Sequence, residues 1–225
     1  MNLKNYFTKK ELLLWLVSLM TILLSFLIFK GNSILTLVAS IIGVTSLIFN
    51  AKGNPIGQFL MIVFSILYGI ISFSFSYFGE MLTYVGMTAP MALFSMVSWI
   101  KHPYNGNKSE VKVNNLSTLD KVIMLILTIC VTFVFYFVLK FFHTANLIPS
   151  TISVSTSFLA VYLTFRRSSY YAIAYATNDV VLIILWVMAS MTDGMYWSVV
   201  ICFVVFLIND IYGFVSWKNM QKRQM

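Results

Sequence analysis

Two carboxylates stand in the middle of long apolar runs, and each follows an asparagine: Asn178-Asp179 and Asn209-Asp210. An ionisable side chain at such depth in a membrane is costly unless it faces a cavity or a partner. No lysine or arginine lies at comparable depth, so neither acid has an evident ion-pair partner. An asparagine in a span can simply join two helices. Two unpaired acids nevertheless favour a site that hydrogen-bonds a polar solute.

Aromatic side chains recur at helical spacing around the first pair. At about 100° per residue, one arc of roughly 80° collects five side chains. They are Tyr171, Tyr175, Asn178, Leu182 and Trp186. Any single aromatic in such a stripe can be explained by packing alone, but together they suit a site for a flat ring.

The next apolar run carries a broader stripe of the same kind. It holds Asn209, Tyr212 and Trp217, with Asp210 at its edge. Aromatic rings stack on flat groups, and a cationic ring gains further from ring faces and from negative charge. Both stripes therefore favour a flat, heteroaromatic and hydroxylated solute.

Four further residues are secondary candidates for the same site. Gln58 begins one apolar run and Tyr68 lies in its middle, while Trp99 ends the run that follows. That later run is interrupted at Thr88-Ala89-Pro90. A proline frees a backbone carbonyl and can kink a helix, which suits a hinge, a pore lining or ordinary packing.

Catalysis has no support in these residues. An enzyme needs a nucleophile with a base, or a metal cluster. Both histidines lie outside the apolar runs, and no His-x-x-x-His, Cys-x-x-Cys or Ser-Lys arrangement occurs within them. We therefore predict no catalytic residue, no metal and no cofactor. The net charge of +8 predicts contact with anionic lipid rather than with nucleic acid.

The elements that must position these residues are membrane-spanning helices. The chain is 60% hydrophobic and 10% charged, whereas soluble domains carry roughly 25% charged residues. A spanning helix needs about 20 mostly apolar residues. Apolar runs between polar punctuation predict one all-α, polytopic membrane domain over residues 1–225. Its eight helices are expected at 11–29, 33–50, 56–78, 81–100, 122–141, 147–165, 168–190 and 194–217, with a polar loop at 101–121.

The positive residues predict the orientation of these helices. With the N-terminus in the cytoplasm, all but two of the 15 lysines and arginines fall on the cytoplasmic side, as the positive-inside rule requires. Only Lys30 and Lys140 fall outside, where Glu80 and Asp193 mark two outer turns. We therefore expect both termini to be cytoplasmic.

A short repeat suggests how the helices are organised. Two runs end in Val-Ser-Trp, at 97–99 and 215–217. If 33–100 and 147–217 are two copies of a three-helix bundle, the helix at 122–141 is a linker that lets both copies run in the same direction, and 11–29 is an added helix. Such repeats hold their substrate between them near the bilayer midplane. Interfacial anchoring of tryptophan also explains the match.

Longer motifs point to a known family. They are the stretches at 79–90 and 98–103, Asn178-Asp179 followed by Trp186, and 209–213 with Trp217. Over roughly residues 50–225 the chain resembles the nicotinamide riboside transporter family, PnuC. The resemblance implies a fold similar to that of the SWEET sugar transporters, assembled as a homotrimer in the bacterial cytoplasmic membrane.

The same resemblance implies uptake of nicotinamide riboside by facilitated diffusion with alternating access. A cytoplasmic kinase then traps the product by phosphorylation. Relatives carry thiamine or other nucleosides, which are also flat rings with polar appendages. Two other possibilities stay open: proton-coupled transport through Asp179 or Asp210, since buried carboxylates can hold protons, and a pore or receptor subunit that does not transport.

Overall fold

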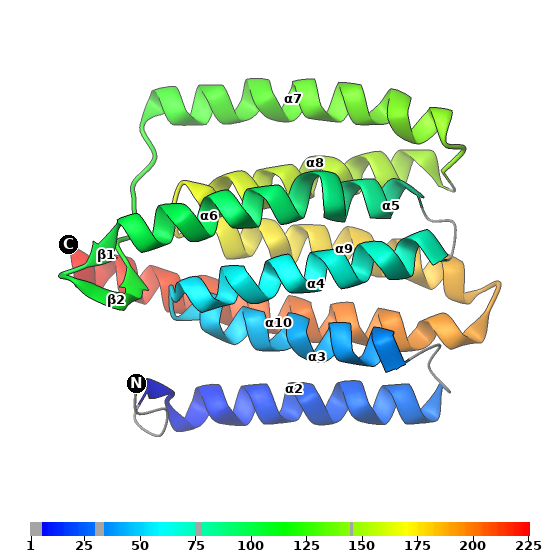
Figure 1. Ribbon diagram of the computed structural model, residues 1–225, viewed down its shortest axis with the longest axis horizontal. Coiled ribbons are helices and arrows are strands. Elements are labelled where there is room, and N and C mark those ends of the chain that lie inside the picture. The colour runs from blue at the N-terminus through cyan, green and yellow to red at the C-terminus, as the bar shows by residue number, and fades with distance from the viewer. Residues whose placement is uncertain (1–5, 30–33, 75–77, 145) are drawn as a thin grey trace.

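The computed structural model describes residues 6–29, 34–74, 78–144 and 146–225. Within these ranges, eight helices are long and apolar enough to cross a membrane. They lie side by side, and both termini are at the same end of the bundle (Figure 1). The predicted all-α membrane class and the number of spans are confirmed. Lys4, Lys30, Ser33 and residues 75–77, which figure in the predicted spans or charge count, lie outside the described residues.

The elements follow one another along the chain in a regular order. They are α2 (Lys9–Ile28), α3 (Ile34–Ala51), α4 (Pro55–Ser74), α5 (Phe78–Thr83), the π-helical η1 (Tyr84–Thr88), α6 (Ala89–Lys101), β1 (Pro103–Tyr104), β2 (Asn107–Val111), α7 (Thr118–Phe141), α8 (Leu147–Phe165), α9 (Tyr171–Ser190), η2 (Gly194–Tyr196) and α10 (Trp197–Gln224).

Capping residues explain why two helices start earlier than predicted. Thr8 and Glu11 form a capping box at the start of α2, and Ser117 and Asp120 form another at the start of α7. In a capping box, the cap side chain and the acid three residues later satisfy backbone N–H groups that have no partner within the helix. Because these residues are polar, hydropathy alone places both starts too late.

The helices form two three-helix bundles. One contains α3, α4 and the continuous α5–η1–α6 helix, and the other contains α8, α9 and α10. The bundles meet where α3 packs on α10 and where α6 packs on α8. Outside them, α7 lies against α8, and α2 packs on both α3 and α10 (Figure 1).

The Val-Ser-Trp repeat makes the same contacts in both bundles. Trp99 of α6 donates its indole N–H to the carbonyl of Thr164 in α8, at 3.0 Å. Trp217 of α10 donates to the carbonyl of Asn50 in α3, at 2.8 Å. The serine before each tryptophan makes a similar contact. The Ser98 hydroxyl donates to the carbonyl of Phe165 in α8, at 3.1 Å, and the Ser216 hydroxyl donates to that of Ala51 in α3, at 2.7 Å. Each bundle therefore ends by fastening its last helix to the first helix of the other.

The predicted interruption before Pro90 takes the form of a π-helical turn. Proline has no N–H for the carbonyl four residues earlier, and the N–H of Ala89 instead bonds the carbonyl of Tyr84, five residues back. Such turns occur frequently at functional sites. Tyr84 and Thr88 are buried in the bundle, whereas Pro90 is exposed on its surface.

The polar connection after α6 contains a small hairpin that the sequence analysis treats as loop. Its strands, β1 and β2, pair antiparallel around Asn105 and Gly106, which both have positive φ angles of 48° and 77°. Asn-Gly is a common dipeptide for such a two-residue turn. We refer to the end that carries the termini and this hairpin as the basic end, and to the end with Glu80 and Asp193 as the acidic end.

Candidate functional site

A small cavity lies between the two bundles, near the middle of α9 and α10. Its volume is about 30 Å³, room for roughly two water molecules. Its polar lining residues include Thr88, Ser157, Tyr175, Asn178, Asp179 and Asp210. We call this space the central cavity. The first and second bundles both contribute to its wall.

Two carboxyl groups meet in the wall of the central cavity. Asp179 and Asp210 are each 4% exposed, and both line this one cavity. The Oδ2 atom of Asp179 has no hydrogen-bond partner among the described residues. No lysine or arginine is among the described residues that line the cavity. This wall can therefore accept hydrogen bonds from a solute and favours positive charge.

Asn178 is held in place by three hydroxyl groups of α8. Its Oδ1 atom lies 3.4 Å from the hydroxyl of Ser153, 2.8 Å from that of Thr156 and 3.0 Å from that of Ser157. Because α8 occupies the amide oxygen, the amide NH₂ is the group of Asn178 that can donate to a solute in the cavity.

Aromatic rings form a further part of the cavity lining, which we call the aromatic wall. The ring of Phe64 contacts those of Tyr84 and Phe206, with centroids 5.8 Å and 5.6 Å away, and Phe203 packs on Phe206 at 5.7 Å. Gly43 makes room for these rings, since a Cβ there would lie 2.5 Å from Phe206 Cζ. The cavity lining thus combines acids and an amide with aromatic rings, which together suit a flat polar solute.

Two further cavities lead from the acidic end toward the centre. A cavity of about 300 Å³, the vestibule, is lined by Glu80, Ser150, Leu185 and Trp186 among others. A narrow space of about 10 Å³, the passage, shares Glu80, Ser150 and Leu185 with the vestibule and Tyr84 with the central cavity. The shared residues place the three spaces in series between the acidic end and the centre, and we call this series the route.

The predicted stripe on α9 runs along this route. Trp186 lines the vestibule, Leu182 the passage, and Asn178 and Tyr175 the central cavity. Tyr171 lies beyond the centre, toward the basic end, with 1% of its surface exposed. One face of a single helix therefore contacts every section of the route.

The stripe on α10 is divided between two environments. Asp210 lines the central cavity. Asn209 instead donates to the hydroxyl of Ser18 in α2, at 2.9 Å, and Tyr212 donates to Glu11 of α2, at 3.1 Å. These two side chains face the added helix rather than the cavity, because adjacent residues of a helix point about 100° apart.

Four other predicted residues lie at the basic end. Trp99, Trp217 and Tyr171 form one buried aromatic cluster, with centroid distances of 5.3 Å between the tryptophans and 4.7 Å from Trp217 to Tyr171. Gln58 donates to Asn50 Oδ1, at 2.8 Å, beside the Trp217 contact. This cluster closes the bundle on the far side of the central cavity from the vestibule.

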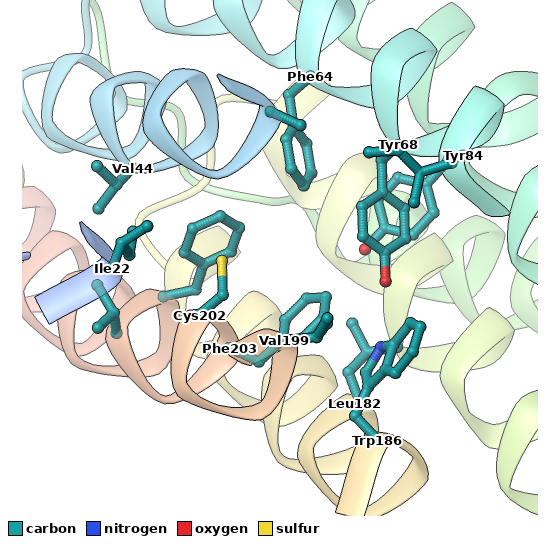
Figure 2. Close-up of a cluster of buried hydrophobic side chains, with 14 of the residues drawn as sticks. Ile22, Val44, Phe64, Tyr68, Tyr84, Leu182, Trp186, Val199, Cys202 and Phe203 are labelled. Atoms are coloured by element: carbon teal, nitrogen blue, oxygen red, sulfur yellow. The ribbon is translucent and has the colours of Figure 1, made fainter. Parts of the chain in front are cut away.

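Tyr68 reaches the acidic side of the route. Its ring packs on Tyr84 at a centroid distance of 4.5 Å, and its hydroxyl donates to Glu80 at 3.2 Å. Figure 2 shows the hydroxyl groups of Tyr68 and Tyr84 directed toward Leu182 and Trp186 of α9. Thr88, the remaining predicted residue, lines the central cavity.

Sequence reasoning missed several residues of this route. Phe203 and Phe206 precede Asp210 at i−7 and i−4, so a stripe drawn through Asp210 instead of Asn209 finds both. Phe64 lies at i−4 from Tyr68 in the same way. Glu80 was expected only to mark an outer turn, and its position near a helix end gave no sign that it faces inward.

Within the described residues, eight apolar helices define a polytopic membrane protein with a central cavity between its two bundles, and its relatives are transporters rather than enzymes. The chain belongs to the family described as "Nicotinamide mononucleotide transporter", whose family model matches residues 33–219. The match excludes α2 and includes both bundles.

Two known proteins resemble the chain over most of its length. The nicotinamide riboside transporter PnuC of Neisseria mucosa is 26% identical over 216 residues, which cover 93% of this chain and 81% of that protein. A crystal structure described as that of the vitamin B3 transporter PnuC superposes with a TM-score of 0.83 at 23% identity, over 97% of this chain and 94% of that one. The second likeness supports the fold.

Proposed function

We propose that this protein takes up nicotinamide riboside by facilitated diffusion. The observation that carries the proposal is the central cavity, which is lined by acids, an amide and aromatic rings, and in which no described lining residue is basic. Nicotinamide riboside is a flat pyridinium cation with a hydroxylated sugar. Its ring can stack while its sugar and amide hydrogen-bond, and its positive charge gains from both acids and ring faces.

The charge of the cavity favours the riboside over the mononucleotide. The mononucleotide adds a phosphate group, which needs positive partners such as arginine or lysine. The described residues that line the vestibule, the passage and the central cavity include neither. Asp179 and Asp210 would repel a phosphate brought into the centre. Thiamine, also a cation, remains the main alternative substrate, followed by other nucleosides.

We assign the binding roles residue by residue. Asn178, Asp179 and Asp210 hold polar groups of the substrate, with Thr88 and Tyr175 beside them, and Phe64 and Tyr84 pack on its rings. Trp186 and Tyr68 act on the route from the vestibule. Gln58, Trp99, Tyr171 and Trp217 act at the closed basic end, while Asn209 and Tyr212 support the site through α2.

Alternating access accounts for the size of the central cavity. About 30 Å³ is far less than the roughly 300–1,000 Å³ of ordinary ligand pockets, so the bundles must move apart to admit a substrate. The SWEET-like pairing of two bundles, each fastened to the other through its final tryptophan, suits a rocking motion about the site.

The surroundings of the protein follow from its charges and its relatives. Lysines and arginines gather at the basic end, so we infer that both termini are cytoplasmic in the bacterial cell membrane and that these residues contact anionic lipid. We also propose a homotrimer, and a cytoplasmic kinase that phosphorylates the substrate and so prevents its return. Measurement of the mass of the protein in a membrane-like environment tests the trimer. We expect a single mass three times that of one chain, and a monomer there would refute the trimer.

Uptake by purified protein in sealed vesicles tests the function. We expect saturable entry of labelled nicotinamide riboside without ATP, equilibration of the label across the membrane, and no competition by the mononucleotide. Thiamine entry without riboside entry would keep the mechanism and change the substrate. Binding without entry, or entry that never saturates, would refute a transporter in favour of a receptor or a pore.

Proton coupling is the second candidate because two buried carboxyl groups, Asp179 and Asp210, line the central cavity together. A buried carboxyl group beside another acid can hold a proton, and the substrate could exchange for that proton. A proton gradient should then drive the riboside above its equilibrium concentration. Uptake that is unchanged after an ionophore collapses the gradient would remove this candidate.

A further inference from the structure

Glu80 occupies a position that no role described so far uses. It lies in the first turn of the continuous α5–η1–α6 helix at the acidic end, and its side chain lines both the vestibule and the passage. It belongs to none of the three ion pairs found among the described residues. Among the described residues that line the vestibule, the one other ionisable group is His143, which is exposed.

The carboxylate of Glu80 accepts a hydrogen bond from Tyr68, and the ring of Tyr68 packs on Tyr84, which lines the passage. The Tyr68 hydroxyl donates to Glu80 Oε2 at 3.2 Å, and the Tyr68 ring packs on Tyr84 at 4.5 Å. Tyr84 and Leu182 both line the passage, which holds about 10 Å³. Tyr84 and Leu182 therefore narrow the route next to Glu80.

We propose that Glu80 selects for positive charge at the entrance to the passage and holds the Tyr68–Tyr84 pair across it until a cation arrives. A carboxylate in a partly desolvated wall attracts a cation more strongly than one in open water. A cationic solute in the vestibule competes with Tyr68 for Glu80, and loss of that hydrogen bond frees the tyrosine pair to move. The inference rests on the proposed uptake of a cationic vitamin precursor.

A pair of substrates that differ in charge tests this role. Nicotinamide riboside is a cation, and its dihydro form has nearly the same shape without the charge. In vesicles, Glu80→Gln should raise the half-saturation concentration for the cation about tenfold or more, and change that for the neutral form less than about twofold. Added salt should weaken cation uptake by the unmodified protein and have less effect on the variant, because ions screen exposed charge.

Three further variants separate charge selection from folding. Glu80→Asp keeps the charge and should restore most of the discrimination. Tyr68→Phe keeps Glu80 but removes the hydroxyl, so it should preserve discrimination and raise the maximal rate. Asp193→Asn is the matched control, since Asp193 is an exposed acid at the same end, where it accepts a hydrogen bond from the N–H of Met195. It should change neither substrate.

The other possible results would refute the role of Glu80, the proposed function or both. Equal effects of Glu80→Gln on the charged and neutral substrates, or no effect on either, would overturn the inference. If the unmodified protein admits no riboside, the proposed function fails and the same variants are compared with thiamine as the cation and uridine as the neutral solute. Unmodified protein that admits neither cation would overturn both proposals.

Discussion

The two three-helix bundles make equivalent hydrogen bonds to each other, but they contribute different side chains to the central cavity. Trp99 and Trp217 make equivalent hydrogen bonds across the seams between the bundles. Yet both acids of the central cavity, Asp179 and Asp210, come from the second bundle, and the first bundle offers Phe64, Tyr84 and Thr88 there. The repeated elements thus build the scaffold, while the differences between the copies build the candidate site.

The acidic wall should dominate binding. We expect Asp210→Asn to weaken binding of nicotinamide riboside about 10- to 100-fold, since a hydrogen bond to a charged group contributes roughly 1.5–3 kcal/mol. Titration calorimetry on the purified protein measures this change. Thr88→Val is the control from the first bundle, where the hydroxyl already donates to the Thr83 carbonyl at 3.2 Å, and it should cost less than about threefold. Equal losses would break the comparison.

The aromatic wall depends on close packing behind it. Gly43→Ala should push the Phe206 ring toward the central cavity, because the new Cβ would lie 2.5 Å from Phe206 Cζ. Overpacking of this kind costs roughly 1–3 kcal/mol of stability, and we expect weaker substrate binding as well. Gly86→Ala is a matched control, since nothing lies within 4 Å of a Cβ there. We therefore expect Gly43→Ala to lower both the unfolding temperature and the substrate uptake more than Gly86→Ala does.

Substitution of the two asparagines should distinguish a residue that binds the substrate from one that stabilises the fold. Asn178→Leu removes an amide that lines the central cavity and should weaken binding about two- to tenfold, as expected for a neutral hydrogen bond worth roughly 0.5–1.5 kcal/mol. Asn209→Leu loses its contact with Ser18 of α2, so it should lower the unfolding temperature while changing affinity less than about twofold. A larger loss of affinity from Asn209→Leu would return that residue to the substrate.

Loss of the two equivalent tryptophan hydrogen bonds should give the smallest difference in stability between the bundles. Trp99→Phe and Trp217→Phe each leave a buried carbonyl without its indole donor, which costs roughly 1–3 kcal/mol. Because the two contacts are equivalent, we expect nearly equal losses in the free energy of unfolding, measured by denaturation in detergent. If one variant were much less stable than the other, the two bundles would not be equivalent even as scaffold.

The fold was readable from the sequence because its signals are local. The length of each apolar run sets the number of spans, and the matching Val-Ser-Trp endings indicated a repeat whose hydrogen bonds the structure contains. Helix starts were less accurate where capping residues such as Thr8 and Ser117 are polar. The hairpin around Asn105-Gly106 was missed because a polar connection gives no hydropathy signal.

Part of the candidate site was also readable from single helices. A buried acid is costly wherever it stands in a span, which singled out Asp179 and Asp210, and helical spacing placed Tyr175 and Asn178 beside them. The structure brings these four residues to one cavity. Their role in binding stays a prediction until the variants above are measured.

Only tertiary structure decided which neighbour each helix face meets. Asn209 and Asp210 are adjacent in sequence, yet one contacts α2 and the other lines the central cavity, because consecutive helical residues point about 100° apart. Glu80 lies near a helix end, where a charge is inexpensive and carries no signal. It faces the passage only because α5 packs beside α4, which brings Tyr68 to it. Hydropathy measures the cost of burying a residue, whereas contacts between helices distant in sequence determine what that residue can bind.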